Sequence, residues 1–419
     1  MFWCEKVDLN IRSNAASEES LWERNIKFNN LHGIAQALVD NMFRPFIGIF
    51  AIAVGASNFQ IAMLSSLPAI VSSLTMLPGT RLINRSANKK RLTAVLFLLN
   101  RIFFLAAAAI PVLPFEYRSL ALVLAVGLMN LPGAISIVAW QSLMGQLIPS
   151  ELRGSAFARR NQLAGMGSLL PTILTGYLLD RLPSPWGYQL IFSVAFGFAL
   201  IEIYIFMNLK AAGESGANTE QLEEQLCSLT EIAAEKNFFR YMISSLVFYF
   251  GWQMAWPLFT LYQVKTLGAN NTWIAIYSAI ITGVSVLSYP WWGRHADKKG
   301  NYATLVLATF GMAISPLMVA VSSNLWILAV FTISMGFFTA GTVLILFNAM
   351  LDIAPSYIRT SCVAYYNTLI NLSATIAPFV GSAILELSNI YVALAVAALL
   401  RGFGTLAFHL ARREYLLGK

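Results

Sequence analysis

The sequence predicts an all-α integral membrane protein with twelve transmembrane helices, built as two pseudo-symmetric six-helix bundles. Hydrophobic residues make up 57% of the 419 residues, charged residues only 11%, and the mean hydropathy is +0.64. These values lie far from those of soluble proteins. Apolar runs of about 20 residues, the length of helix that crosses the hydrocarbon core, recur along the chain. An internal repeat divides the chain into two halves.

The repeat relates residues 45–85 to residues 257–298. Val54-Gly55-Ala56-Ser57-Asn58 in the first copy matches Leu267-Gly268-Ala269-Asn270-Asn271 in the second. Arg44-Pro45-Phe46 likewise matches Trp256-Pro257-Leu258. Because these patterns recur in the same order, we interpret the two halves as duplicates.

The predicted spans follow the apolar runs in order. In the first half they cover residues 33–54, 58–78, 92–113, 119–146, 157–179 and 188–208. In the second half they cover residues 241–263, 272–292, 302–321, 325–350, 361–385 and 390–411. Polar segments flank them as a tail at 1–31, a linker at 209–239 and a second tail at 412–419. The two bundles are therefore expected at 32–208 and 240–411.

Polar loops mark the ends of several spans. In the first half, the second span is followed by the cations of residues 81–91, the fourth by Pro149–Gly154 and the sixth by the acidic linker. In the second half, the second span precedes Gly293–Asn301 and the fourth precedes Pro355–Thr360. The loops after the second and fourth spans thus recur at equivalent places in the two halves.

Lys and Arg residues set the expected topology, because cations that flank spans are retained on the cytoplasmic side. Most of the 28 fall in the N-terminal tail, in the linker or after even-numbered spans. We therefore expect a multi-pass protein of the cell (inner) membrane with both termini in the cytoplasm, its first span an uncleaved anchor. The same distribution accounts for the net charge of +8 without a nucleic-acid partner.

The linker and the cysteines indicate no further domain or metal site. Within the linker, Leu222, Leu226, Leu229 and Ile232 recur at helical spacing, which predicts an amphipathic helix along the cytoplasmic surface. The cysteines are odd in number, at positions 4, 227 and 362, and are expected on or near the reducing side. Neither a disulfide framework nor a metal site is therefore expected.

A short motif after the eighth span resembles the signature of a known family. The segment from Gly293 through Asp297 and Lys298 to Gly300 and Asn301 resembles the G-x-x-x-D-(R/K)-x-G signature of the major facilitator superfamily. The loops at Pro149–Gly154 and Pro355–Thr360 lie where that family repeats them. The resemblance extends from about Gly33 to Arg413 and implies a transporter whose two halves rock about a site between them.

The resemblance also implies a conformational latch, in which the signature carboxylate meets the start of the fifth or eleventh helix. Asp297 would then lie near Arg153, Arg159 and Arg160. The first half departs from the signature, since Thr80 and Asn84 replace the glycine and the aspartate, so we expect a weaker latch there. The alternative is that Gly293 and Asp297 serve only turn geometry and topology. The predicted latch residues are Asn84, Arg85, Arg153, Gly293, Asp297, Lys298 and Arg359.

Ionisable residues within spans are costly and therefore mark candidate functional groups. Asp40 and Arg44 lie at i and i+4 near the middle of the first span and can pair. Pro45 follows at once, which should loosen the helix there. Arg101 in the third span is a candidate partner for Asp40. The three bases and two acids within spans, counting Glu202 and Arg401, hint at an anionic substrate.

Glu202 and Arg401 lie in the sixth and twelfth spans, which usually stand outside the cavity of the family. We therefore interpret both as structural residues or as side chains that face lipid. Cavity-lining helices of the family supply the remaining candidates. The predicted substrate-binding or coupling residues are Asp40, Asn41, Arg44, Arg101, Asn130, Gln141, Trp252, Gln253, Trp256 and Asn348. Asn41 and Gln253 occupy equivalent positions in the repeat. For each amide, hydrogen bonding between helices is an equally good account.

The principal hypothesis is a secondary active transporter that moves a small molecule by alternating access. Its partners would be membrane lipid, the substrate and protons, with Asp40 as the coupling group, and we expect a monomer. Burial favours a neutral Asp40 and Arg44 favours a charged one, so uniport and anion exchange stay open. One alternative is a multidrug or metabolite efflux pump. A second is a transport-inactive scaffold or sensor. No catalytic motif indicates an enzyme, and no cofactor is expected.

Overall fold

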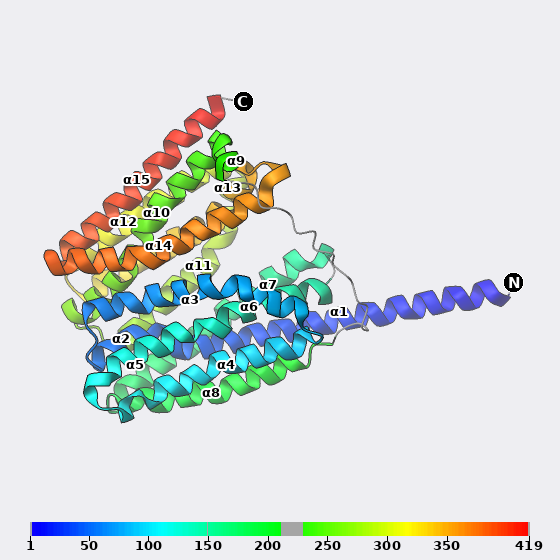
Figure 1. Ribbon diagram of the computed structural model, residues 1–419, viewed down its shortest axis with the longest axis horizontal. Helices are drawn as coiled ribbons and strands as arrows, with labels where there is room; N and C mark the ends of the chain where they lie inside the picture. The colour runs from blue at the N-terminus through cyan, green and yellow to red at the C-terminus, as the bar shows by residue number, and fades with distance from the viewer. Residues whose placement is uncertain (1, 149, 211–228, 418–419) are drawn as a thin grey trace.

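The computed structural model describes residues 2–148, 150–210 and 229–417. The helices form two bundles that lie side by side (Figure 1). The first bundle consists of α1 (Phe2–Phe43), a 3-10 turn (Arg44–Phe46), α2 (Ile47–Ala53), α3 (Asn58–Arg85), α4 (Lys89–Ala109), a 3-10 turn (Ile110–Val112), α5 (Phe115–Leu128), α6 (Asn130–Leu147), α7 (Ser150–Arg181) and α8 (Trp186–Met207). The second consists of α9 (Leu229–Ala234), α10 (Lys236–Leu261), a π turn (Tyr262–Thr266), α11 (Asn271–Lys299), α12 (Asn301–Val321), α13 (Leu325–Ile353), a 3-10 turn (Ser356–Ile358), α14 (Arg359–Leu387) and α15 (Ile390–Leu417).

The repeated sequence forms a repeated turn. Gly55 and Gly268 both have positive φ, at 89° and 69°, a conformation that glycine adopts without steric cost. In each copy a polar residue two positions later caps the next helix. The Ser57 hydroxyl accepts a hydrogen bond from the Gln60 amide, and the Asn270 side chain accepts one from the Trp273 amide. The duplication inferred from sequence is therefore present in the backbone.

The packing of the two bundles follows the same scheme. In the first, α1 packs against α7 and α8, and α4 packs against α6 and α8. In the second, α10 packs against α14 and α15, and α12 packs against α13 and α15. The halves meet where α7 packs against α11 and α3 packs against α14, which are again equivalent pairs. The fold is thus the predicted pair of pseudo-symmetric bundles.

Nine helices in the described part of the chain are long and apolar enough to cross a membrane. The other three predicted spans, at 33–54, 157–179 and 241–263, correspond to α1 with α2, to α7 and to α10. These three carry many of the polar and aromatic side chains discussed below. A helix whose polar residues face the protein interior has lower mean hydropathy than one that faces lipid.

Two spans are interrupted, the first of them where the sequence predicts a loosened helix. The first breaks at Pro45, which lies in the 3-10 turn between α1 and α2. The fourth breaks at Met129, between α5 and α6 and just before Pro132. The Asn100 amide of α4 donates a hydrogen bond of 2.7 Å to the Met129 carbonyl. The same carbonyl accepts from the Gly133 backbone N–H at 3.2 Å, so the Asn100 side chain adds a second hydrogen bond at the break.

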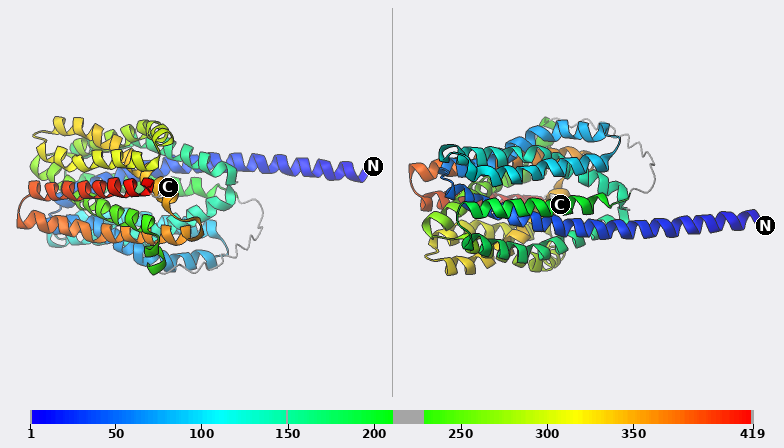
Figure 2. Two further views of the ribbon diagram at one scale, coloured as in Figure 1. Left: turned by 90° about the horizontal axis from the view of Figure 1, so that it is seen from above. Right: turned by 90° about the horizontal axis from the view of Figure 1, so that it is seen from below.

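Some boundaries differ from those predicted. Helix α1 begins at Phe2, so the predicted tail continues the first span as helix and extends beyond the bundle (Figures 1 and 2). Gly293 and Asp297 were expected in a loop, but they lie in α11. This helix continues to Lys299 and is capped by Gly300, which has a φ of 83°. Lys298 and Lys299 carry positive charges at the C-terminal end of α11, where they interact favourably with the negative end of the helix dipole. This interaction favours the longer helix. Residues 211–228, with most of the predicted amphipathic helix, lie outside the described residues.

The halves contact each other towards one end of the helices, which we call the closed end and which carries residues 54–58, 181–186, 262–271 and 387–390. The other end, with residues 85–89, 299–301 and 353–359, we call the opposite end. A Cβ on Gly176 would lie 2.6 Å from the Asn271 carbonyl oxygen, and one on Gly48 would lie 2.7 Å from Thr260 Cγ2. These contacts require the absence of a side chain on one partner.

Candidate functional site

A buried ion network joins three helices of the first half. Arg101 of α4 donates from Nη1 to Asp40 Oδ1 of α1 at 2.6 Å. Its Nε and Nη2 donate to the two carboxylate oxygens of Glu202 of α8, each at 3.1 Å. One guanidinium therefore holds two carboxylates from two different helices. Such charge-assisted pairs are the strong hydrogen bonds of protein interiors.

Two further groups extend the network in opposite directions. Arg44 Nε lies 3.3 Å from Asp40 Oδ1, and the Arg44 side chain is 56% exposed. His32 Nε2 lies 3.6 Å from Glu202 Oε1, and both of those side chains are almost fully buried. The network thus runs from an exposed cation at the break in the first span to a buried imidazole about three turns earlier along the chain.

The Asp40–Arg44 and Asp40–Arg101 pairs are both present, as the spacing and depth of these residues suggested. Glu202 was assigned to a structural or lipid-facing role, and it does not face lipid, because its relative exposure is 0%. We had placed the sixth span outside the site because the sixth helix usually stands outside the cavity in the family that the sequence resembles. The signal that could have corrected this was Glu202 itself, because a carboxylate within a span needs a partner.

Arg401 was interpreted in the same way, and it too is fully buried. Its guanidinium donates to the carbonyl oxygens of Gly251 and Met312 at 3.2 and 2.9 Å, and to Ser315 Oγ at 2.7 Å. It therefore ties α15 to α10 and α12. Arg401 supplied the excess of bases that hinted at an anion. Because it is enclosed by backbone carbonyls, it gives no support to an anionic substrate.

A third arginine, Arg160 of α7, packs against α1. It donates to Gln36 Oε1 at 2.5 Å, and its guanidinium lies 4.4 Å from the centre of the Trp140 ring. Gly33 makes room for it, since a Cβ there would lie 2.7 Å from Arg160 Cγ. The sequence marked Arg160 only as a neighbour of Asp297, and its role within the first half was missed.

Arg44 and Trp256 lie at equivalent positions of the repeat and at equivalent depths. Gly48 meets Thr260 across the two halves, and Arg44 and Trp256 each lie four residues before that contact on their own chain segments. Both side chains are open, with Arg44 56% and Trp256 51% exposed. Next to the contact between the halves, the first half thus carries a guanidinium and the second an indole.

The other aromatic residues of α10 lie deeper. Trp252 is 9% exposed and stacks on Tyr249 with ring centres 5.4 Å apart. Trp252 therefore belongs to the interior of the second half, while Trp256 does not. Gln253 lies between them and is half-buried.

The predicted amides are not brought together by hydrogen bonds. Asn41 donates to the Ala37 carbonyl of its own helix at 2.8 Å, and Asn130 donates in the same way to Val126. Gln141 is exposed, and Asn348 is half-buried in α13. Within the described residues no bond links Asn41 to Gln253, so a paired-amide site stays a prediction.

The closed end carries a contact that the sequence did not indicate. Asp180, at the end of α7, accepts hydrogen bonds from the backbone amides of Asn271 and Thr272 at 2.9 and 2.8 Å. The Tyr188 hydroxyl donates to Asn271 Oδ1 at 2.7 Å. Lys265 donates to Asn58 at 2.9 Å, which links the halves a second time. The role of Asp180 could not be predicted, because a residue that caps a helix of the other half and a residue in a solvated loop have the same local sequence pattern at the polar end of a span.

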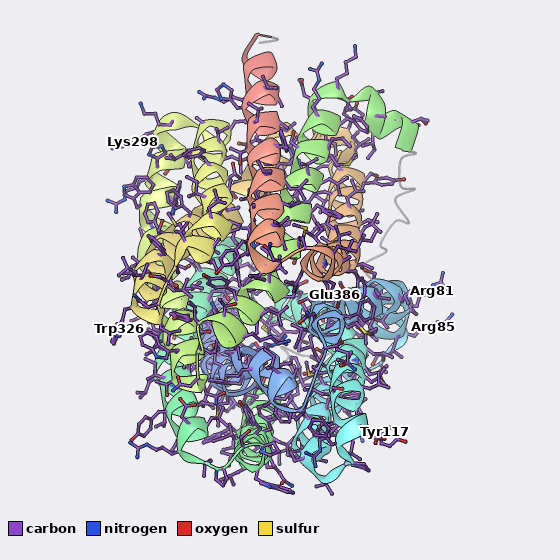
Figure 3. All side chains as sticks on the ribbon, turned by 90° about the vertical axis from the view of Figure 1, so that its left-hand side faces the viewer. Arg81, Arg85, Tyr117, Lys298, Trp326 and Glu386 are labelled. Atoms are coloured by element: carbon purple, nitrogen blue, oxygen red, sulfur yellow. The ribbon has the colours of Figure 1, made fainter. Side chains whose placement is uncertain are left out.

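The predicted latch residues lie at the opposite end. Within the described part of the chain, no ion pair joins Asp297, which is exposed, to Arg153 or Arg160. Arg153 instead donates to the carbonyls of Ile148 and Gly145. Arg85 lies at the edge of the first half and Lys298 at the edge of the second (Figure 3). The latch, with Gly293, Asn84 and Arg359, therefore stays a prediction.

No cluster of His, Cys, Asp and Glu in the described residues could hold a metal ion. The groups that converge are ion pairs, aromatic rings and hydrogen-bond donors. They suit a binding surface and a charge network, and they form no nucleophile with an adjacent base.

Comparison with known proteins gives a consistent family. Residues 32–313 and 241–416 match the Major Facilitator Superfamily. The multi-drug resistance efflux pump PmrA of Streptococcus pneumoniae is 23% identical over 375 residues, which cover 87% of this chain and 90% of PmrA. The multidrug resistance protein MdtG of Proteus mirabilis is 29% identical over 91 residues, which cover 20% of this chain and 22% of MdtG.

The fold is also that of a solved transporter. A crystal structure of a mutant of the nucleoside transporter NupG aligns with a TM-score of 0.72 at 12% identity, covering 92% of this chain and 99% of that one. NupG without the mutation aligns with a TM-score of 0.68, again at 12% identity. At this identity the similarity is one of fold alone.

Proposed function

The chain belongs to the Major Facilitator Superfamily, and from that premise we propose that it exports aromatic, amphiphilic small molecules in exchange for protons. As a member it is a multi-pass secondary transporter of a small molecule, with no enzymatic role. The substrate class, direction and coupling are our proposal. Of the hypotheses drawn from the sequence, we thus prefer the efflux pump to a transporter of an anionic substrate.

The observation that carries the proposal is the placement of Arg44 and Trp256. An open indole beside the contact between the halves offers a face on which an aromatic substrate can stack. An open guanidinium at the equivalent depth offers hydrogen bonds and can itself stack on a ring. The similarity to PmrA over most of both chains supports the same class of substrate, since PmrA is described as a multi-drug efflux pump.

The proposed coupling element is the ion network that begins at Arg44. Asp40 touches both Arg44, next to the binding surface, and Arg101, which reaches Glu202 in α8. A substrate that displaces Arg44 would change the charge balance at Asp40 and, through Arg101, at Glu202. Charge and substrate are then linked through one helix, α1.

We place the opposite end of the helices in the cytoplasm, because the cations of residues 81–91, 153–160 and 294–299 gather there. On this orientation both termini are cytoplasmic and the closed end faces outward. The halves are then in contact on the outside, as in an inward-facing stage of alternating access. A substrate in the cytoplasm or inner leaflet would enter first.

A thermal-shift screen of the purified protein tests the binding surface, because a ligand that binds the native state raises its stability. We would compare the aromatic cation ethidium, the aromatic anion 2-naphthoate and a non-aromatic sugar. Stabilisation by aromatic compounds that is lost in Trp256→Ala supports the proposal. Trp326→Ala is the matched control, since Trp326 is 73% exposed at the closed end of α13.

The screen can also overturn the proposal. Stabilisation by 2-naphthoate alone, lost in Arg44→Ala and kept in Trp256→Ala, would support the hypothesis of an anionic substrate instead. Stabilisation by the sugar and by neither aromatic compound would remove the aromatic substrate class altogether. Drug tolerance of cells that lack their own pumps provides an independent check on export.

A further inference from the structure

We propose that Glu202, with His32 beside it, holds the proton that is exchanged, while Asp40 stays ionised between two arginines. This inference rests on the proposed proton-driven export and assigns a further residue to it. It adds a carboxylate from α8 that the sequence had set aside.

The first step concerns the balance of charges. Arg101 is the shared partner of two carboxylates, Asp40 and Glu202, and can neutralise only one. Asp40 has a second cation within 4 Å, because Arg44 Nε lies 3.3 Å from it. Glu202 has no second arginine or lysine within that distance among the described residues. When Asp40 is paired with Arg44, Arg101 and Glu202 form the remaining pair, and a proton can enter or leave it at the carboxylate.

The second step concerns burial. The Glu202 side chain is 0% exposed, whereas that of Asp40 is 22% exposed. An ionised carboxylate away from water is costly unless it is fully compensated. Among the described residues Glu202 has one arginine partner, which it shares with Asp40. Protonation of Glu202 therefore lowers the free energy of the network whenever Arg101 moves towards Asp40. Protonation of Asp40 would lower the free energy less, because Arg44 still compensates the charge of that carboxylate.

The third step concerns the proton's path. His32 is fully buried between the rings of Phe97 and Phe206, at centre distances of 5.4 and 5.3 Å. Neither ring nitrogen has a hydrogen-bond partner among the described residues, yet Nε2 lies 3.6 Å from Glu202 Oε1. Asn29, one turn closer to the opposite end, is also fully buried, and its two polar side-chain atoms have no hydrogen-bond partner within the described part of the chain. Buried polar groups are rarely left so, and these two point to a polar path from the opposite end to Glu202.

The charged and titratable groups that face Glu202 come from each neighbouring helix. Helix α1 contributes His32 and Asp40, α4 contributes Arg101, and α7 contributes Arg160. Arg160 pairs with neither carboxylate within 4 Å and is bound to Gln36. Its positive charge disfavours a resting imidazolium at His32, which therefore passes the proton on.

The proton transfer is a simple exchange of bonds. His32 first takes a proton from water at the opposite end, which forms its second N–H bond. An N–H bond of this imidazolium then breaks and an O–H bond forms at Glu202, which leaves a neutral imidazole and a neutral carboxyl group. On release the O–H bond breaks and the proton returns to water. No other bond changes, and Arg101 then pairs with the carboxylate that remains charged.

Infrared spectroscopy of the purified protein tests the assignment, because a protonated carboxyl group has a carbonyl stretch distinct from that of a carboxylate. We expect a pH-dependent carboxyl band in the parent protein. It should disappear in Glu202→Gln, shift in Glu202→Asp and persist in Asp40→Asn. Glu116→Gln, at an exposed residue of α5, is the matched control and should leave the band unchanged.

Flux measurements separate this inference from the function on which it rests. In vesicles, Glu202→Gln should keep ethidium flux down its own gradient and lose accumulation driven by a pH gradient. A band that persists in Glu202→Gln and vanishes in Asp40→Asn would overturn the assignment and leave proton-driven export standing. A parent protein whose flux ignores the pH gradient would overturn proton-driven export itself, whatever the infrared result. If Glu202→Gln does not fold, the band shift in Glu202→Asp decides between the two carboxylates.

Discussion

Asp180 caps a helix of the other half of the molecule, with its Oδ1 2.9 Å from the backbone nitrogen of Asn271. It accepts from the Asn271 side chain at 3.0 Å and from the Thr272 hydroxyl at 2.5 Å as well. A carboxylate at the first turn of α11 satisfies amides that have no partner within their own helix and also interacts favourably with the helix dipole. Asp180, at the end of α7, therefore makes four of the hydrogen bonds that join the halves at the closed end.

We predict that Asp180→Ala opens the closed end. Hydrogen bonds to a charged group contribute about 1.5–3 kcal/mol each, so losing this cap should shift the balance between conformations by tenfold or more. Thiol labelling of a cysteine placed at Ala269, which is buried at the closed end in a cluster that includes residues of both halves, would report the opening. Asp352→Ala is the control, because Asp352 bonds to Asn301 within the second half at the opposite end. Equal labelling in the parent and in Asp180→Ala would contradict the role of Asp180.

A side chain at Gly176 should prevent the same contact sterically. The Cβ of Gly176→Ala would lie 2.6 Å from the Asn271 carbonyl oxygen and 2.5 Å from Ala275 Cβ, and neither group can rotate away. We expect at least a tenfold loss of transport with the protein still folded, as measured by flux together with thermal unfolding. Gly197→Ala should behave like the parent, since nothing lies within 4 Å of a Cβ there. Normal flux in Gly176→Ala would show that this close approach is dispensable.

The register between α7 and α11 is compatible with the predicted latch. A Cβ on Gly176 would contact Ala275, and one on Gly165 would contact Val286, so α7 and α11 run antiparallel in a constant register. Continued to the opposite end, this register places Asp297 within one residue of the position facing Arg153. We predict that cysteines at these two positions cross-link when the opposite end closes.

Asp180→Ala offers a way to test that prediction. Because it should favour the conformation in which the opposite end is closed, cross-linking of the pair at 153 and 297 should rise several-fold in that background. Mass spectrometry of the linked peptides gives the measurement. A pair at 166 and 297 is the control, because the exposed Met166 lies more than three turns further along α7 than Arg153. Absence of cross-linking in both backgrounds would favour the alternative that Asp297 only sets topology.

Arg401 should contribute to stability and not to coupling. In Arg401→Met the guanidinium's bonds to Gly251, Met312 and Ser315 are lost, which we expect to cost about 3 kcal/mol. Thermal unfolding should show a lower Tm, while the pH dependence of flux per folded protein stays that of the parent. Arg294→Met, at an exposed position of α11, is the control. A changed pH dependence would instead make Arg401 part of the coupling network.

The fold was predictable because hydropathy and duplication act along the chain. Apolar length gave the spans, and the repeat around Gly55 and Gly268 gave the two halves. The break at Pro45 was predictable for the same reason, since proline acts on its own helix. The end of α11 was placed too early, because the charged residues after its apolar stretch continue the helix outside the expected span.

The site was only partly predictable, because its contacts join helices that are far apart in sequence. Asp40 and Arg44 lie four residues apart, so their pairing could be read from one helix. Glu202 lies in α8, and only the packing of α8 against α1 and α4 shows that it faces Arg101. Asp180 and Arg160 were missed for a related reason, since a cap or a cation–π contact with a distant partner leaves no local pattern.

Proton-driven flux in reconstituted vesicles tests the central claim most directly. A pH gradient is imposed across vesicles that contain the purified protein, and ethidium movement is followed by fluorescence with Trp256→Ala as the comparison. The account predicts that ethidium accumulates in the compartment of lower pH, that the effect collapses with a protonophore and that it is lost in Trp256→Ala. Ethidium movement that is unchanged by the gradient, or equal in empty vesicles, would contradict it.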